Sequence, residues 1–286
     1  MGETRVPAPL MVLGGIISVQ IGAAFAKELF ATAPPTAMVW MRLITSAVIF
    51  AVAFRPRVTG RSRKDWLVVL AYGVCLCTMN WAIYQSFARI PLGMAVTIEF
   101  LGPLVISIIG SRRLADLLWV GLAGAGVALL GFSPTGLTLV GVLFALLAGL
   151  GWAGYILTTA QTGRRWPGMS GLAVASWVGA IVMAPPAILR AGAILLQPRV
   201  LLVGLAVGLL SSVIPYSLEL IALRRIPARV FGILMSLEPA TAALAAMVVL
   251  GEFLAWNQWL ALGCVVGASV GATRTSRAGR VAPAPD

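Results

Sequence analysis

The sequence predicts an all-α integral membrane protein with ten transmembrane helices, arranged as two inverted repeats of five helices. The first observation is composition: of 286 residues, 60% are hydrophobic and only 10% are charged, whereas a soluble domain has about 25% charged residues. A soluble fold with this composition would lack the polar side chains to cover its surface. The second observation is a series of long apolar runs, and the third is a motif that occurs twice.

Charged residues and Pro or Gly breaks divide the chain into ten apolar runs, each close to the length of about 20 residues that crosses a bilayer. Helices are expected, because backbone groups in lipid must bond internally. In the first run, Ala24-Phe25-Ala26 resembles a signal-peptidase site, but the run exceeds a signal-peptide core of about 7–15 residues, so we expect a membrane helix. The runs are 8–30, 34–54, 66–88, 91–111, 116–133, 137–160, 169–189, 199–222, 228–250 and 255–273.

The distribution of Lys and Arg predicts the orientation. With the N-terminus in the cytoplasm, sixteen of the 21 Lys and Arg residues lie on the cytoplasmic side, four lie on the other side, and Arg42 lies within a helix. Cytoplasmic loops are enriched in these residues, so both termini are expected in the cytoplasm. The net charge of +12 is then a topology signal, and the expected partner is the lipid bilayer rather than nucleic acid. Tryptophans at run ends read as interface anchors: Trp66, Trp119, Trp166 and Trp256.

A repeated motif predicts two related halves. Arg89-Ile90-Pro91 recurs as Arg225-Ile226-Pro227, and Pro103 recurs as Pro239 at the same spacing. Each half contains five runs, an odd number, so the second half is expected to enter the membrane in the opposite orientation. Inverted repeats are typical of secondary transporters, whose binding site lies near the bilayer midplane between the halves. The expected divisions are 1–134, 135–274 and a cytoplasmic tail over 275–286.

Five charged residues fall within the apolar runs. Arg42, Glu99 and Glu238 lie near the middle of theirs, whereas Lys27 and Glu219 lie toward the ends. A charge at the centre of a membrane helix costs at least ~2.5–3.5 kcal/mol, so each is a candidate for a substrate or proton site. The alternative for Arg42 is a structural ion pair with one of the two central glutamates. Glu219 is close enough to the arginines that follow it to be an ordinary interfacial charge.

Prolines inside the runs predict broken helices. A proline leaves the carbonyl four residues earlier without its usual donor. Pro103 and Pro239 lie close to Glu99 and Glu238, and broken helices beside buried charges are a recurring way to build a midplane site. Pro215 fits a simple packing kink equally well. The freed carbonyls are those of Glu99, Ser211 and Met235.

Further polar residues share helix faces, at spacings of three, four or seven residues. They are expected either to line a cavity or to form hydrogen bonds between helices. The chain has no His, and its three cysteines lie in apolar runs, so we expect no catalytic triad, metal site or cofactor, and no enzyme. The candidate pairs are Gln20 with Lys27, Asn80 with Tyr84, Trp152 with Tyr155, and Tyr216 with Glu219.

Seven segments carry a resemblance to a known family: S-V-Q-I-G-A-A-F-A-K (18–27), M-N-W (79–81), I-P-L-G-M-A-V-T-I-E-F-L-G-P-L (90–104), S-R-R (111–113), P-Y-S-L-E (215–219), F-G-I-L-M-S-L-E-P-A (231–240) and L-G-E (250–252). With them the chain resembles the EamA type of the drug/metabolite transporter superfamily, and within it the bacterial inner-membrane exporters of threonine and homoserine. The resemblance implies two EamA repeats, efflux of small amino acids across the cytoplasmic membrane, and proton antiport.

The candidate residues can be interpreted with that substrate. The ammonium group of an amino acid needs an anionic or carbonyl partner, and its carboxylate needs a cation or a helix N-terminus. Glu99 or Glu238 meets the first need, and Arg42 or Lys27 the second. A proton-coupled exporter also needs a group that binds proton and substrate in turn. Without His, a buried carboxyl is the candidate, since burial disfavours its charged form, and Glu99 is our choice. Export of another small metabolite or a drug is the alternative.

Overall fold

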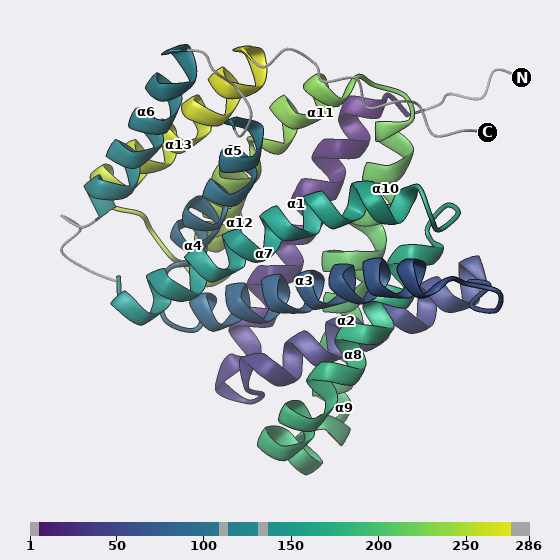
Figure 1. Ribbon diagram of the computed structural model, residues 1–286. Helices are drawn as coiled ribbons and strands as arrows, with labels where there is room; N and C mark the ends of the chain where they lie inside the picture. Colours follow the sequence, from purple (N-terminus) through teal and green to yellow (C-terminus); the bar gives the residue numbers. More distant parts are fainter. Residues whose placement is uncertain (1–5, 109–113, 131–136, 276–286) are drawn as a thin grey trace, which may run out of the picture.

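A computed structural model describes residues 6–108, 114–130 and 137–275, and the secondary structure in these ranges is helical throughout (Figure 1). The predicted all-α class is therefore confirmed. The helices are α1 (Ala8–Glu28), α2 (Pro35–Phe54), α3 (Arg63–Phe87), α4 (Leu92–Glu99), α5 (Leu101–Ile108), α6 (Leu114–Leu130), α7 (Leu139–Gly163), α8 (Ser170–Ala191), α9 (Pro198–Gly208), α10 (Ile214–Leu223), α11 (Ala228–Met235), α12 (Glu238–Leu250) and α13 (Trp256–Thr275), with 3-10 turns at Leu29–Ala31 and Gly192–Leu196 and a π-helical turn at Leu209–Val213.

Within the described ranges, seven helical stretches are long and apolar enough to cross a membrane, so the chain is a multi-pass membrane protein. Among the described residues, each predicted run contains helix, and three runs are divided: by a break at Phe100, by the π-helical turn, and by a break at Ser236 and Leu237. The seven stretches are Ala8–Ala31, Pro35–Phe54, Arg63–Phe87, Leu139–Gly163, Ser170–Leu196, Pro198–Leu223 and Val230–Leu250.

Local sequence explains where the helices begin and end. α3 begins three residues before the predicted run, because Ser62 and Asp65 form a capping box: the Ser62 hydroxyl accepts from the Asp65 N–H (3.2 Å) and Asp65 accepts from the Ser62 N–H (3.0 Å). α12 ends at Gly251, whose φ of 66° is a left-handed conformation that glycine adopts without steric cost.

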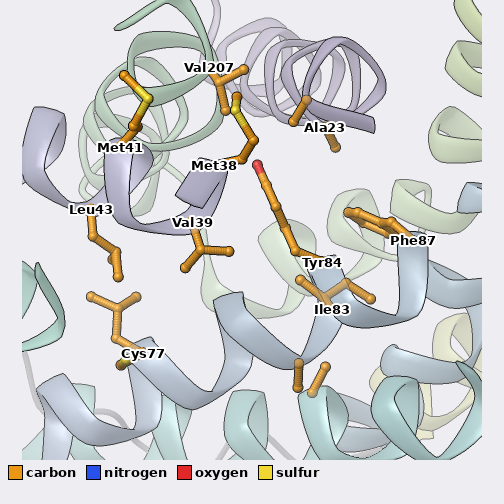
Figure 2. Packing of buried hydrophobic residues seen from close by; sticks show 14 of the residues in the cluster. Ala23, Met38, Val39, Met41, Leu43, Cys77, Ile83, Tyr84, Phe87 and Val207 are labelled. Carbon is orange, nitrogen blue, oxygen red and sulfur yellow. The ribbon is translucent and has the colours of Figure 1, made fainter. Parts of the chain in front are cut away.

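The helices pack as a bundle around one main core. α3 contacts α7 and α8, α2 contacts α8, α1 contacts α10 and α12, and α6 lies beside α13 at one edge (Figure 1). Figure 2 shows part of this core, where Val39 and Leu43 of α2 face Cys77 and Ile83 of α3. The packing brings helices from the beginning, middle and end of the sequence around the same central space.

One prediction about the surface is wrong. Trp166, which we expected as an interface anchor, is only 1% exposed. Its indole N–H donates to the Asp65 carbonyl (3.3 Å), and the guanidinium of Arg61 lies 4.5 Å from its ring centroid. The connection between α7 and α8 thus packs onto the beginning of α3, a contact between distant segments that local hydropathy does not reveal.

Candidate functional site

A cavity of about 110 Å³ lies at the centre of the bundle. Its wall is built from eight helices and carries three carboxyl groups and one guanidinium group. Most of the predicted site residues meet here. The predicted residues on the wall are Gln20, Arg42, Asn80, Glu99, Trp152, Tyr155, Tyr216 and Glu238.

The break between α4 and α5 positions the first carboxylate. Glu99 is the last residue of α4, and α5 resumes after Phe100. The Glu99 carbonyl, which Pro103 leaves without a helical donor, lies against Gly149 of α7, where a Cβ atom would be only 2.8 Å from the carbonyl oxygen. Backbone therefore packs directly on backbone at this break, while the Glu99 side chain reaches the cavity.

The break between α11 and α12 positions the second carboxylate differently. Glu238 is the first residue of α12 and is followed by Pro239, so it lies at a helix N-terminus, which favours negative charge. Glu99 lies at a helix C-terminus, which favours positive charge. Within the described residues, neither carboxylate forms a hydrogen bond or an ion pair within 4.0 Å. Both groups are therefore available to a ligand.

Arg42 supports the π-helical turn as well as lining the cavity. Its Nη2 donates to the Ser211 carbonyl (2.6 Å) and its Nε donates to the Ser212 hydroxyl (2.8 Å). Pro215 frees that carbonyl, so a guanidinium N–H takes the place of the missing backbone donor. The alternative of an ion pair with Glu99 or Glu238 is not seen among the described residues. These two bonds use two of the five N–H groups of the guanidinium.

Lys27 lies outside the cavity wall. Its Nζ pairs with Glu252 Oε1 (2.5 Å) and donates to the Ile90 carbonyl (2.9 Å), while Glu252 Oε2 accepts from the Leu92 N–H (2.8 Å). The ion pair therefore ties α1, the beginning of α4 and the segment after α12 together. A structural partner explains the charge of Lys27 without a substrate.

Tyr84 is also placed elsewhere than predicted. Figure 2 shows its ring among Ala23, Met38 and Phe87, and the side chain is fully buried. Its hydroxyl makes no hydrogen bond of ordinary geometry within the described residues. Tyr84 contributes to the apolar core, and the guanidinium of Arg42 lies 5.8 Å from its ring centroid.

The position of Glu219 differs from the expectation for an interfacial charge. We expected an interfacial charge, but the side chain lies on the wall of the central cavity. The available signal was its position three residues after Tyr216, which places both on one face of α10. The same stretch of α10 passes close to α1, since a Cβ at Gly15 would contact both Pro215 and Glu219.

The chain is similar in sequence to known transporters. The EamA-like transporter family matches residues 139–274. The chain is 41% identical over 271 residues to the threonine/homoserine exporter RhtA of Escherichia coli (strain K12), covering 94% of this chain and 92% of that protein. The same figures apply to RhtA of Salmonella typhimurium (strain LT2). The uncharacterized transporter YwfM of Bacillus subtilis (strain 168) is 30% identical over 145 residues, covering 51% of this chain and 49% of its own.

A solved crystal structure shares the fold. It superimposes with a TM-score of 0.66 at 19% sequence identity, over 93% of this chain and 96% of the other. The sequence match to RhtA extends over nearly the whole of both proteins. These relatives are named as exporters and transporters rather than enzymes. The chain therefore belongs to the EamA-like transporter family.

Proposed function

We propose that the protein exports small amino acids, threonine and homoserine in particular, across the cytoplasmic membrane in exchange for protons. The substrate assignment follows the name of the relatives that are 41% identical over 94% of the chain. The observation that carries it is the wall of the central cavity, where Glu99 and Glu238 lack hydrogen-bond and ion-pair partners within the described residues and the Arg42 guanidinium supplies a positive charge. An amino-acid zwitterion needs charges of both signs.

Glu99 is the proposed site of exchange between proton and substrate. As a carboxylate it binds the ammonium group of an amino acid that arrives from the cytoplasm, and the C-terminal end of α4 also favours a positive group there. On the outer side a proton replaces the ammonium group on the carboxylate. The protonated side chain then returns and releases its proton to the cytoplasm. Arg42 is the proposed partner of the substrate carboxylate, and Glu238 supplies a second negative charge toward the ammonium group.

The size of the cavity favours a small substrate. Pockets for drug-sized ligands are roughly 300–1,000 Å³, whereas this cavity is about 110 Å³. Export of a drug would need a substantially larger space, and we therefore favour the amino acid over the alternative.

The packing of the helices supports ten membrane spans in two inverted repeats. The proposed first repeat, 1–134, contains α1, α2, α3, α4 with α5, and α6; the second, 135–274, contains α7, α8, α9 with α10, α11 with α12, and α13. Exchanging the two sets preserves several of the main contacts: α3 with α7 corresponds to α10 with α1, and α3 with α8 corresponds to α9 with α2. α2 with α8 and α6 with α13 are contacts between equivalent members. Such symmetry suits alternating access. The proposed topology places both termini in the cytoplasm.

Counterflow in proteoliposomes tests the proposal. Purified protein is reconstituted with unlabelled homoserine inside, and uptake of radiolabelled threonine is followed with and without a pH gradient. We expect exchange in both cases and additional net transport when the gradient is imposed. Transport of an unrelated drug without exchange of threonine or homoserine would favour the alternative. Threonine uptake that is the same with and without the pH gradient would overturn the proposed proton coupling but not the proposed substrate.

A further inference from the structure

A second cavity, of about 190 Å³, lies beside the central one. It is formed by α3, α7, α10 and the beginning of α8, together with the connection between α7 and α8. Tyr155, Tyr216 and Glu219 line both cavities. These three side chains are therefore the partition between two spaces.

Aromatic rings form the apolar part of this partition. The rings of Tyr155 and Tyr216 are stacked, with centroids 6.5 Å apart and an angle of 23° between their planes. Tyr72 of α3 extends the layer, since its ring centroid lies 5.1 Å from that of Tyr155. None of the three rings belongs to an ion pair, so a rotation of one side chain would open a path between the cavities without breaking one.

Polar groups on the second cavity are suited to a cationic ligand. Glu219 is the one charged residue among those that line it, and its carboxylate has no hydrogen bond or ion pair within the described residues. Thr162 also lines the cavity, and its Oγ1 is buried without a hydrogen bond to any described residue. A buried hydroxyl without a partner is a costly arrangement, which a polar ligand or water would relieve.

The second cavity lies at one end of the central cavity, and the Lys27–Glu252 ion pair lies at the other. α1 and α10 run antiparallel, since Gly22 adjoins Ser211 whereas Gly15 adjoins Glu219. Lys27 lies beyond Gly22, so about 12 residues, or roughly 18 Å of helix, separate it from the level of Glu219. The connection at the second cavity contains two arginines, at 164 and 165, which places it on the cytoplasmic side of the proposed topology.

We propose that the second cavity is a cytoplasmic access site, where the ammonium group of an amino acid binds Glu219 before it passes Tyr155 and Tyr216 into the central cavity. This assignment rests on the proposed function for its direction and its substrate class. It gives Glu219 a role in capture that is distinct from the exchange of proton and substrate at Glu99. Movement of the Tyr155 and Tyr216 rings then controls entry of the bound amino acid into the central cavity.

A labelling experiment tests occupancy of the site. Thr159 lines the second cavity and is exposed, so Thr159→Cys is introduced into the full-length protein with Cys75, Cys77 and Cys264 replaced by Ala. In inside-out vesicles we expect a membrane-impermeant maleimide to react with this cysteine, and threonine to slow the reaction. Adding Glu219→Gln should remove the protection. The matched control is Leu157→Cys, on the same helix but 54% exposed and outside both cavities, whose labelling threonine should leave unchanged.

A transport measurement separates this inference from the proposed function. Glu219→Gln should raise the half-saturating threonine concentration in counterflow by about 10-fold or more, the effect expected for losing one charge-assisted contact. Glu219→Asp should restore most of the affinity, which a purely structural role would not require. Normal counterflow without protection, and with unchanged half-saturation in Glu219→Gln, would overturn the access site and leave the proposed function standing. Protection without counterflow would uphold the site and overturn the transport.

Discussion

The two helix breaks at the central cavity occupy corresponding places in the two proposed repeats but differ in construction. At the first, the chain passes from α4 to α5 through Phe100 and presses against Gly149 of α7. At the second, Ser236 and Leu237 separate α11 from α12, and the Ser236 hydroxyl is hydrogen-bonded to Ser269 of α13 (2.8 Å). Backbone contact fixes one break, and a side-chain hydrogen bond fixes the other.

The difference shows that two helix breaks of similar position can supply unlike chemistry. Glu99 precedes its break and therefore ends a helix, whereas Glu238 follows its break and begins one. The C-terminal end of the α4 dipole and the N-terminal end of the α12 dipole face the same cavity. A cation is therefore favoured at Glu99 and a negative charge at Glu238. We infer that only Glu99 exchanges a proton, while Glu238 contributes fixed charge.

The largest expected effect comes from Glu99→Gln. This change keeps the shape of the side chain but removes its ability to bind a proton, so proton-driven transport in proteoliposomes should fall to background. Thermal unfolding in detergent should be little affected, because the carboxylate has no ion pair among the described residues. A large loss of stability that Arg42→Gln rescues would instead identify Glu99 as the counter-charge of Arg42. Normal proton-driven transport would contradict its role.

A smaller effect is expected from Glu238→Gln. The variant should lose one charge-assisted contact and raise the half-saturating threonine concentration by about 10-fold, while keeping its response to a pH gradient. Transport measured with and without the gradient distinguishes the two glutamates. If Glu238→Gln loses that response and Glu99→Gln keeps it, their roles are reversed.

Gly149→Ala tests the packing of the first break. The new methyl group would lie 2.8 Å from the Glu99 carbonyl oxygen, so α7 must move away, at a cost of about 1–3 kcal/mol. We expect a lower unfolding temperature and slower exchange. The control is Gly124→Ala on α6, where a Cβ meets nothing within 4 Å. Equal behaviour of the two variants would mean that the contact with α7 does not position Glu99.

The smallest effect is expected from Tyr84→Phe. The hydroxyl is buried without a hydrogen bond to the described residues, so its removal should leave stability unchanged or slightly higher. Transport should stay within about twofold of the unmodified protein, because an uncharged group outside the cavity wall contributes little to binding. Tyr216→Phe, on the cavity wall, is the comparison. A marked loss of transport in Tyr84→Phe would contradict this and would mean that the Tyr84 hydroxyl takes part in transport.

The sequence was sufficient for the helical class and for most of the cavity, because periodic polar residues and intramembrane charges have local signatures. Glu99 and Tyr155 are examples of residues found in this way. The ion pair of Lys27 was not predicted, because its partner, Glu252, lies far along the chain. Glu219 was misjudged because its distance from the arginines that follow it indicates depth but not which face of α10 meets the cavity.

The π-helical turn at Leu209–Val213 makes the site depend on the number of residues as well as on their identity. The Leu210 and Ser211 carbonyls in this turn accept from Ser18 and Arg42, so neighbouring helices hold the extra residue in place. Deleting one residue would restore a regular α-helix and rotate everything that follows by about 100°. The wall residues of α10, among them Tyr216 and Glu219, would then leave the cavity. A deletion of one residue in the π-helical turn would therefore change substrate binding more than a substitution of a single residue on the cavity wall.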